Sequence, residues 1–269
     1  MPRPKILMNG RSQRGSHSIE LFANDPPPPR CLSWLRLLQS VGTTVGSELW
    51  HLIHRAASLD RHSTKTFSIY PIKTFMNLLV LIIGLILFLG MHSARIFADG
   101  KRTELMTKLG ASGWKGLYAL ISLAGFILII YGFGIAREAP VILWESPRWT
   151  RHLAALLTLP AFVLMFASQI TGTHIKARLK HPMVLGVKLW AFAHLLANGR
   201  LHDVILFGAF LLWAVLSFRA ARRRDRALGT VYVAAGVGRD LMAIMLGIGV
   251  WAAFAIYLHV RWIGVQPFG

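Results

Sequence analysis

The residues best suited to chemistry in this 269-residue chain are its histidines. There are 11 of them, as many as the Asp and Glu residues together, and only one cysteine, Cys31. His92 and His194 lie in long apolar segments, where an ionisable group costs roughly 3 kcal/mol even on a lenient insertion scale. Lys188 shares a segment with His194, and Arg95 follows His92 by three residues on the same helix face. These four residues are the candidate site.

A pair of histidines in apolar helices can support metal chemistry. Neutral imidazole is a common metal ligand and an axial ligand of haem iron. Trp190 and His194 are four residues apart, so their side chains share a helix face. Histidines from two helices of a bundle can hold a b-type haem between them. A packed, hydrogen-bonded histidine is the competing interpretation of His194, and a solvated interfacial histidine that of His92.

Six apolar segments must position these residues. Hydrophobic residues make up 54% of the chain and charged residues 15%, against about 25% charged in an average soluble domain. Runs of about 18 or more apolar residues are typical of membrane-spanning helices. The sequence therefore predicts an all-α integral membrane protein, a bundle of about six transmembrane helices. The expected spans are 76–97, 117–135, 152–170, 182–198, 204–218 and 241–259.

Basic residues are distributed unevenly between the two ends of these spans. The loops after the first, third and fifth spans define side A, and the other loops define side B. Side A carries Lys101, Arg102, Lys108, Lys115, Lys176, Arg178, Lys180, Arg219, Arg222, Arg223, Arg224, Arg226 and Arg239. From residue 76 on, side B carries only Arg137, Arg148, Arg151, Arg200 and Arg261. The positive-inside rule therefore places side A in the cytoplasm. It also accounts for the net charge of +19, so we expect a lipid bilayer as partner and no nucleic acid.

His92 and His194 are expected at different depths in the membrane. His92 lies towards side A and His194 towards side B, each about four or five residues from the middle of its span. At roughly 1.5 Å per residue, their separation along the membrane normal is ~13 Å. Helix tilt would reduce this gap. Otherwise His174 and His181, both on side A, are rival partners for His92.

Residues 1–75 differ from the rest of the chain. They contain a run of four prolines at 26–29, many basic residues and no apolar core of the kind a secretory signal needs. Placed on side B, their basic residues would cancel the charge bias described above. We therefore predict that 1–75 is a disordered or non-native N-terminal extension, with the true start at Met76. The transmembrane domain would then cover 76–269.

Short motifs from residue 116 onward form a recognisable set. The densest stretch contains His181-Pro182-Met183, Gly186-Val187-Lys188-Leu189-Trp190-Ala191, His194-Leu195 and Asn198-Gly199. Others are Gly116-Leu117-Tyr118, Ser122-Leu123-Ala124-Gly125, Tyr131-Gly132, Ala136-Arg137, Trp144, Leu206-Phe207-Gly208, Phe210 and Trp213-Ala214. In these motifs the chain resembles the NnrU family of bacterial inner-membrane proteins, named for a link to nitrite and nitric oxide reductase expression. The resemblance covers about 76–269.

The NnrU family is in turn related to zeta-carotene isomerase, a membrane enzyme that holds a b-type haem with two histidines. Carried over, this relation implies His92 and His194 as haem ligands. Arg95 or Lys188 would then meet the anionic haem propionates. The isomerase has a cysteine three residues before its second histidine, which takes part in a ligand switch. This chain has Ala191 there and no cysteine after Cys31, so the switch is not expected.

The leading hypothesis is a b-type haem binder of the bacterial inner membrane, linked to nitrite and nitric oxide physiology in denitrification. A first alternative is a haem-dependent cis–trans isomerase of a carotenoid-like polyene, against which Ala191 counts. A second is a cofactor-free membrane assembly or regulatory factor for denitrification enzymes, which are candidate partners in either case. The sequence specifies no catalytic residue, substrate or oligomeric state.

Overall fold

The computed structural model describes residues 70–268, with side chains from residue 74 onward. The predicted extension over 1–75 therefore lies almost wholly outside the described residues. Residues 70–268 belong to one compact unit. This unit contains all the helices discussed below.

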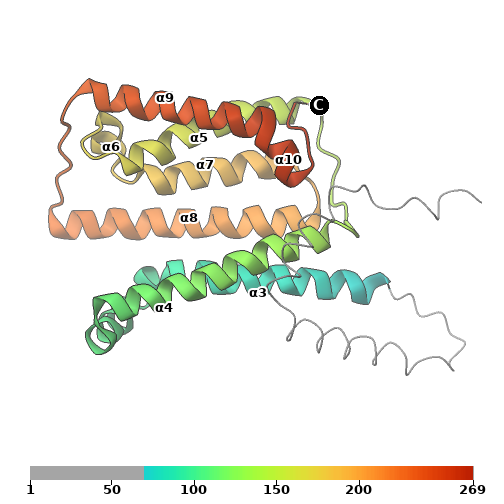
Figure 1. Cartoon of the computed structure of the whole chain (residues 1–269), viewed down its shortest axis with the longest axis horizontal. Helices are drawn as coiled ribbons and strands as arrows, with labels where there is room; N and C mark the ends of the chain where they lie inside the picture. Colours follow the sequence, from blue (N-terminus) through green and yellow to red (C-terminus); the bar gives the residue numbers. More distant parts are fainter. Residues whose placement is uncertain (1–69, 269) are drawn as a thin grey trace, which may run out of the picture. The chain divides into compact units, whose positions relative to one another are not determined.

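The described chain is built from helices (Figure 1). They are α3 (Tyr70–Phe97), α4 (Asp99–Ala136), α5 (Trp149–Gln169), α6 (His174–Leu179), α7 (Pro182–Ala197), α8 (Leu201–Leu228), α9 (Val237–Ala253), the π-helical segment η1 (Phe254–Leu258) and α10 (His259–Ile263). Between residues 70 and 268 the only β-type pairing is an isolated bridge between Ile142 and Arg200. The all-α prediction is confirmed.

Five helical segments are long and apolar enough to cross a membrane: Thr74–Phe97, Asp99–Ala136, Trp149–Gln169, Leu201–Leu228 and Val237–Ile263. The fourth predicted span, 182–198, corresponds to α7, a shorter apolar helix of 16 residues. At about 1.5 Å per residue, α7 is ~24 Å long, a little less than a bilayer core of about 30 Å. The chain is thus a multi-pass membrane protein: each predicted span coincides with an apolar helix in the expected order, and five of these helices are long enough to cross a membrane.

The hairpin of α3 and α4 packs tightly because glycines face the opposing backbone. A Cβ atom at Gly125 in α4 would lie 2.6 Å from the backbone nitrogen of Phe88 in α3. At Gly84 in α3 it would lie 2.7 Å from the backbone nitrogen of Ile129. Small residues at such crossings let two membrane helices approach closely. This close approach fixes the side of α3 that carries His92.

The remaining helices form a second group around α5. Helix α5 packs against α7 and α9, and α7 packs against α8. Helix α8 also contacts α3, so it joins the α3–α4 hairpin to this second group (Figure 1). The buried core lies where these helices meet and consists of Leu81, Leu85, Ile129, Ala191, Leu206 and Phe207.

Two irregularities interrupt the helices on opposite sides of the bundle. On side A, Gly110 has a φ of +73° inside α4, which kinks the helix. This conformation costs glycine little, whereas other residues adopt it rarely. On side B, the last span widens into the π-helical η1 directly before His259. The kink lies next to titratable side chains considered below.

Candidate functional site

His92 is held on α3 by a bond to its own helix. Its Nδ1 lies 2.7 Å from the carbonyl oxygen of Phe88, and its ring stacks on Phe88 with 4.2 Å between centroids. A carbonyl oxygen only accepts hydrogen bonds, so Nδ1 carries the proton and donates. Nε2 then keeps its lone pair, as a metal ligand must. The rings of Tyr118 and Trp213 approach His92 at 5.3 and 6.1 Å.

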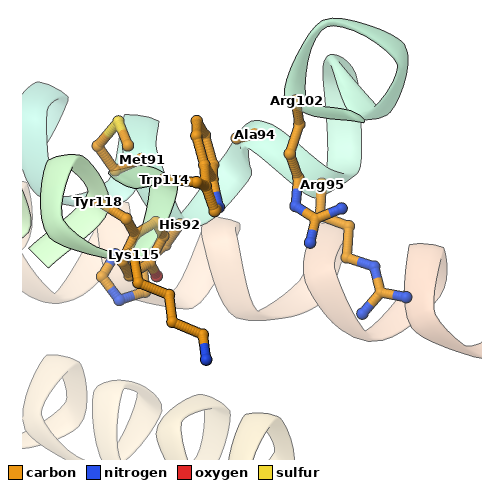
Figure 2. A pocket seen from close by; sticks show the side chains of 8 residues that line it. All are labelled: Met91, His92, Ala94, Arg95, Arg102, Trp114, Lys115 and Tyr118. Atoms are coloured by element: carbon orange, nitrogen blue, oxygen red, sulfur yellow. The ribbon is translucent and has the colours of Figure 1, made fainter. Parts of the chain in front are cut away.

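His92 lines a pocket of about 350 Å³ on side A (Figure 2). The other lining residues are Met91, Ala94, Arg95, Arg102, Trp114, Lys115 and Tyr118. Three of these carry a positive charge and none carries a carboxylate. The pocket thus combines an imidazole and aromatic walls with a cationic rim, which suits an amphipathic anion.

The cationic rim is formed by two helices that meet at side A. Arg95 comes from the last turn of α3, as its spacing from His92 predicts. Arg102 precedes the kink at Gly110 and Lys115 follows it, so the kink brings both to the same pocket. Arg102 also contacts Asp99 at 3.4 Å. The sequence analysis missed Arg102 and Lys115 because it read them only as side-A loop charges.

His194 is built in the same way, on α7. Its Nδ1 lies 2.8 Å from the carbonyl oxygen of Trp190, so this ring also keeps Nε2 free to bind a metal. Its ring stacks on Phe207 at 4.5 Å and lies 5.1 Å from Trp190. The prediction that Trp190 and His194 share a helix face is confirmed.

The two histidines lie at opposite ends of a row of aromatic rings. From His92 the row runs through Phe88 to Phe210 at 5.9 Å, and from Phe210 to Trp190 at 5.6 Å. Trp190 then contacts His194. No ring contact joins His92 to His194 directly within the described part of the chain. The two histidines are thus connected through the rings of three aromatic side chains, and their pairing stays a prediction.

Lys188 contacts neither the ring of His92 nor that of His194 in any of the described ring contacts. Its Nζ atom lies over the ring of Phe218, 5.9 Å from the centroid. Among the described residues, no carboxylate forms an ion pair with it. It does not line the His92 pocket, so the structure separates the two cations, Arg95 and Lys188, that the sequence analysis grouped together.

His174 and His181, the rival partners for His92, are paired with carboxylates. His174 Nδ1 contacts Asp240 at 2.7 Å, and His181 Nε2 contacts Asp225 at 2.8 Å. Tyr232 donates its hydroxyl to the same Asp225 carboxylate at 3.1 Å. Burial, together with the Asp225 carboxylate, raises the pKa of the Tyr232 hydroxyl above its usual value. On side A, the first pair links α6 to α9, and the second links the start of α7 to α8.

A third histidine–aspartate pair lies on side B. Here His202 Nε2 is 3.6 Å from an oxygen of Asp203, too far for a hydrogen bond, and His202 is 2% exposed. The sequence analysis missed the pairs His174–Asp240 and His181–Asp225 because their members are 66 and 44 residues apart. It did not single out His202 or Asp203.

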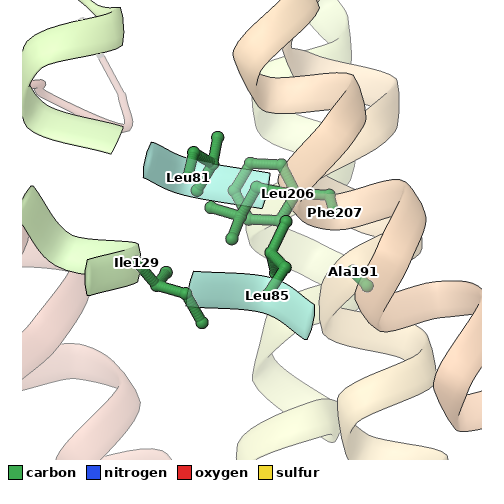
Figure 3. Packing of buried hydrophobic residues seen from close by; sticks show 6 residues of the cluster. All are labelled: Leu81, Leu85, Ile129, Ala191, Leu206 and Phe207. Atoms are coloured by element: carbon green, nitrogen blue, oxygen red, sulfur yellow. The ribbon is translucent and has the colours of Figure 1, made fainter. Parts of the chain in front are cut away.

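The residues at His92 fit a haem by the chemistry of their donors. His92 offers a neutral imidazole nitrogen to iron, and the cationic rim suits carboxylate groups. His194 also has its Nδ1 bonded to a backbone carbonyl and its Nε2 available, but it does not line the cationic pocket at His92. Ala191, one turn before His194, is fully buried in the core (Figure 3). No thiol is therefore present at that position.

Comparison with known proteins identifies the family. No curated protein and no solved structure matches the chain. The sequence profile described as "NnrU protein" matches residues 80–267, which is well over half of the chain. The match includes all helices from α4 onward and most of α3, and with them both candidate histidines. The chain therefore belongs to the NnrU family.

Proposed function

We propose that this NnrU-family membrane protein binds a b-type haem, with His92 as an axial ligand in the side-A pocket. One observation carries the proposal. His92 has its Nδ1 committed to the Phe88 carbonyl, its Nε2 free, and a pocket beside it with three cations on the rim. A histidine that only packed in the core would need neither the pocket nor the cations.

Each part of the pocket has a role in this proposal. Arg95, Arg102 and Lys115 would bind the two propionates, because a carboxylate in a partly apolar site needs a cationic partner. Trp114 and Tyr118 would cover the flat faces of the macrocycle and exclude water. When bound, the haem supplies one-electron and diatomic-gas chemistry. The protein contributes the axial nitrogen, the charge and the shielding.

The resemblance implies His194 as the second ligand of the same iron. Ring contacts through Phe88, Phe210 and Trp190 connect the two histidines. Of the two histidines, only His92 lines the side-A pocket, so we propose His92 as the residue that would hold the haem there.

The physiological setting we propose is the bacterial inner membrane, with side A in the cytoplasm. This rests on the excess of Lys and Arg on side A. The pocket would then open towards the cytoplasm. Denitrification enzymes are the candidate partners, and the proposed physiological role lies in nitrite and nitric oxide metabolism.

The two alternatives make different use of the same residues. A polyene isomerase of the related type would need a thiol where Ala191 is fully buried, so we do not favour it. A cofactor-free assembly factor would leave His92 and its cations without a ligand. Arg95, Arg102 and Lys115 would then serve only as side-A anchors, and no haem would copurify.

The test is a visible spectrum of the purified full chain in mild detergent, oxidised and then reduced with dithionite, after expression with added haem precursor. A Soret band is expected. The His92→Ala variant should lose the Soret absorbance of the haem bound in the pocket. His152→Ala is the matched control, because His152 is an exposed histidine at the start of α5 and lines no described pocket. A colourless protein with intact helical content would overturn the proposal and favour the assembly factor.

A further inference from the structure

A second pocket, of about 600 Å³, lies on side A where α6 meets the start of α9 (Figure 1). It shares no lining residue with the pocket at His92. We propose that this α6–α9 pocket binds the headgroup of an anionic glycerophospholipid that carries a hydroxyl group, such as phosphatidylglycerol. The inference goes beyond the haem-binding function proposed above and does not depend on it.

An uncompensated guanidinium supplies the positive charge of the α6–α9 pocket. Arg178 lines the pocket with an exposed side chain, which forms no ion pair or hydrogen bond within residues 70–268. Two neighbouring side-A cations are bound to carbonyl oxygens, Lys176 to that of Ser168 at 3.0 Å and Arg239 to that of Thr171 at 2.6 Å. Arg178 is therefore the cation left for a ligand, and the planar guanidinium suits the oxygens of a phosphate group.

His174 lines the same pocket one helical turn before Arg178. Its Nδ1 lies 2.7 Å from the Asp240 carboxylate, and an ionised carboxylate only accepts, so Nδ1 donates. Its Nε2 has no hydrogen-bond partner in the described chain, and the His174 side chain is 44% exposed. In the neutral ring this Nε2 accepts hydrogen bonds, so it suits a hydroxyl group next to the phosphate bound by Arg178.

The Asp240 carboxylate positions these two ligand groups. Asp240 is 9% exposed, and its two oxygens accept three hydrogen bonds from α6. They come from the backbone N–H groups of His174 and Ile175, both at 3.0 Å, and from the His174 ring. These bonds hold α6 against α9 and fix the direction of the imidazole. The negative charge is thus directed at α6, and Asp240 forms no ion pair with Arg178 in the described chain.

The rest of the pocket lining is apolar and favours a lipid over a soluble phosphate ester. It consists of Ile175 and Leu179 from α6 and Val237 and Ile244 from α9. Ile244 comes four residues after Asp240, ~6 Å further along the membrane span. Polar groups at the end of the span are therefore followed by apolar groups within it, the same order as headgroup and acyl chain in a phospholipid. A soluble ester would leave the apolar wall in water.

The test is a titration of dioctanoyl phosphatidylglycerol into the purified full chain in mild detergent, followed by native mass spectrometry. One saturable site is expected, with an affinity about tenfold higher than for dioctanoyl phosphatidylcholine. Arg178→Gln should weaken phosphatidylglycerol binding by about tenfold, as expected for one charge-assisted hydrogen bond, and leave phosphatidylcholine binding unchanged. Arg226→Gln is the matched control, because Arg226 is also an exposed side-A arginine and lines neither described pocket.

The role of His174 has its own comparison. Dioctanoyl phosphatidylmethanol carries the same phosphate but no hydroxyl group, so it should bind about threefold more weakly than phosphatidylglycerol, the loss of one neutral hydrogen bond. His174→Phe should remove this difference between the two lipids. Arg178→Gln alters only an exposed side chain, so it keeps the headgroup site testable if His174→Phe fails to fold.

The remaining outcomes contradict the proposal in distinct ways. Equal affinities for phosphatidylglycerol and phosphatidylcholine, or equal losses in Arg178→Gln and Arg226→Gln, overturn the headgroup site. Displacement of the lipid by an equal concentration of glycerol 3-phosphate overturns the lipid assignment and favours a soluble phosphate ester. Equal binding of phosphatidylglycerol and phosphatidylmethanol overturns the hydroxyl contact to His174. The haem spectrum of Arg178→Gln should match that of the wild type, so the two proposals can fail separately.

Discussion

His92 and His194 make the same hydrogen bond in two different helices. Each donates Nδ1–H to the carbonyl oxygen four residues earlier, Phe88 at 2.7 Å and Trp190 at 2.8 Å. The bond fixes both the tautomer and the orientation of the ring, which is what a metal-ligating histidine requires of its surroundings. The two rings nevertheless lie at opposite ends of an aromatic row.

Neutralising the pocket cations should weaken haem binding. We expect Arg95→Gln, Arg102→Gln and Lys115→Gln each to lower haem affinity by about fivefold, because each removes one partly exposed partner of a propionate. The measurement is titration of haem into the apoprotein in detergent. Lys108→Gln is the control, since Lys108 pairs with Glu104 at 2.6 Å and does not line the pocket. Equal effects of Lys108→Gln and Arg95→Gln would mean that only overall charge matters.

Adding a single methyl group between α3 and α4 should destabilise the hairpin. The Cβ of Gly125→Ala would lie 2.6 Å from the backbone of Phe88, so the helices must separate. We expect a loss of about 1–3 kcal/mol, seen as a lower melting temperature in detergent. Gly134→Ala in the same helix is the control, because nothing lies within 4 Å of its added Cβ. A Gly125→Ala variant as stable as Gly134→Ala would contradict the close packing.

Removing the Asp225 carboxylate should loosen side A and change the ionisation of Tyr232. In the folded protein, burial and Asp225 raise the pKa of the Tyr232 hydroxyl. A raised folded-state pKa contributes stability below the unfolded value, about 10 for tyrosine, which is lost as the pH rises through the folded value. Asp225→Asn should move the Tyr232 titration to lower pH, measured as the ultraviolet difference against Tyr232→Phe. An unchanged titration would mean that Asp225 does not influence Tyr232.

The orientation of the bundle can be tested by labelling. With Cys31→Ser as background, Lys108→Cys should react with a membrane-impermeant maleimide only after the inner membrane is permeabilised, because side A is expected in the cytoplasm. Glu145→Cys, in the loop between α4 and α5, should react in intact spheroplasts. Lys108 and Glu145 are both exposed, so the two introduced cysteines are comparably accessible on the protein surface. The reverse pattern would place the pocket outside.

Local patterns predicted the parts of the site that lie within one helix. The i, i+4 spacing of Trp190 and His194 gave a real ring contact, at 5.1 Å. Arg95 lines the same pocket as His92, as their spacing indicates. Apolar run length gave the order of the spans. These features depend only on helix geometry and on the free energy of placing apolar side chains in lipid, which the sequence carries directly.

Non-local features required the tertiary structure. The kink at Gly110 brings Arg102 and Lys115 to the pocket, and the last span contains a π-helical turn at Phe254–Leu258. The pairs His174–Asp240 and His181–Asp225 join positions far apart in the chain. Each depends on how two helices pack and not on the periodicity of either one.

The sequence by itself therefore determined the class of protein, the order of its apolar helices and the candidate histidines. Only the tertiary structure decided which side chains surround each of those histidines. Hydrophobic burial in a membrane is a property of each segment and is nearly additive along the chain. The distance between two side chains on different helices is set by glycine contacts, kinks and aromatic packing, which are properties of the whole bundle.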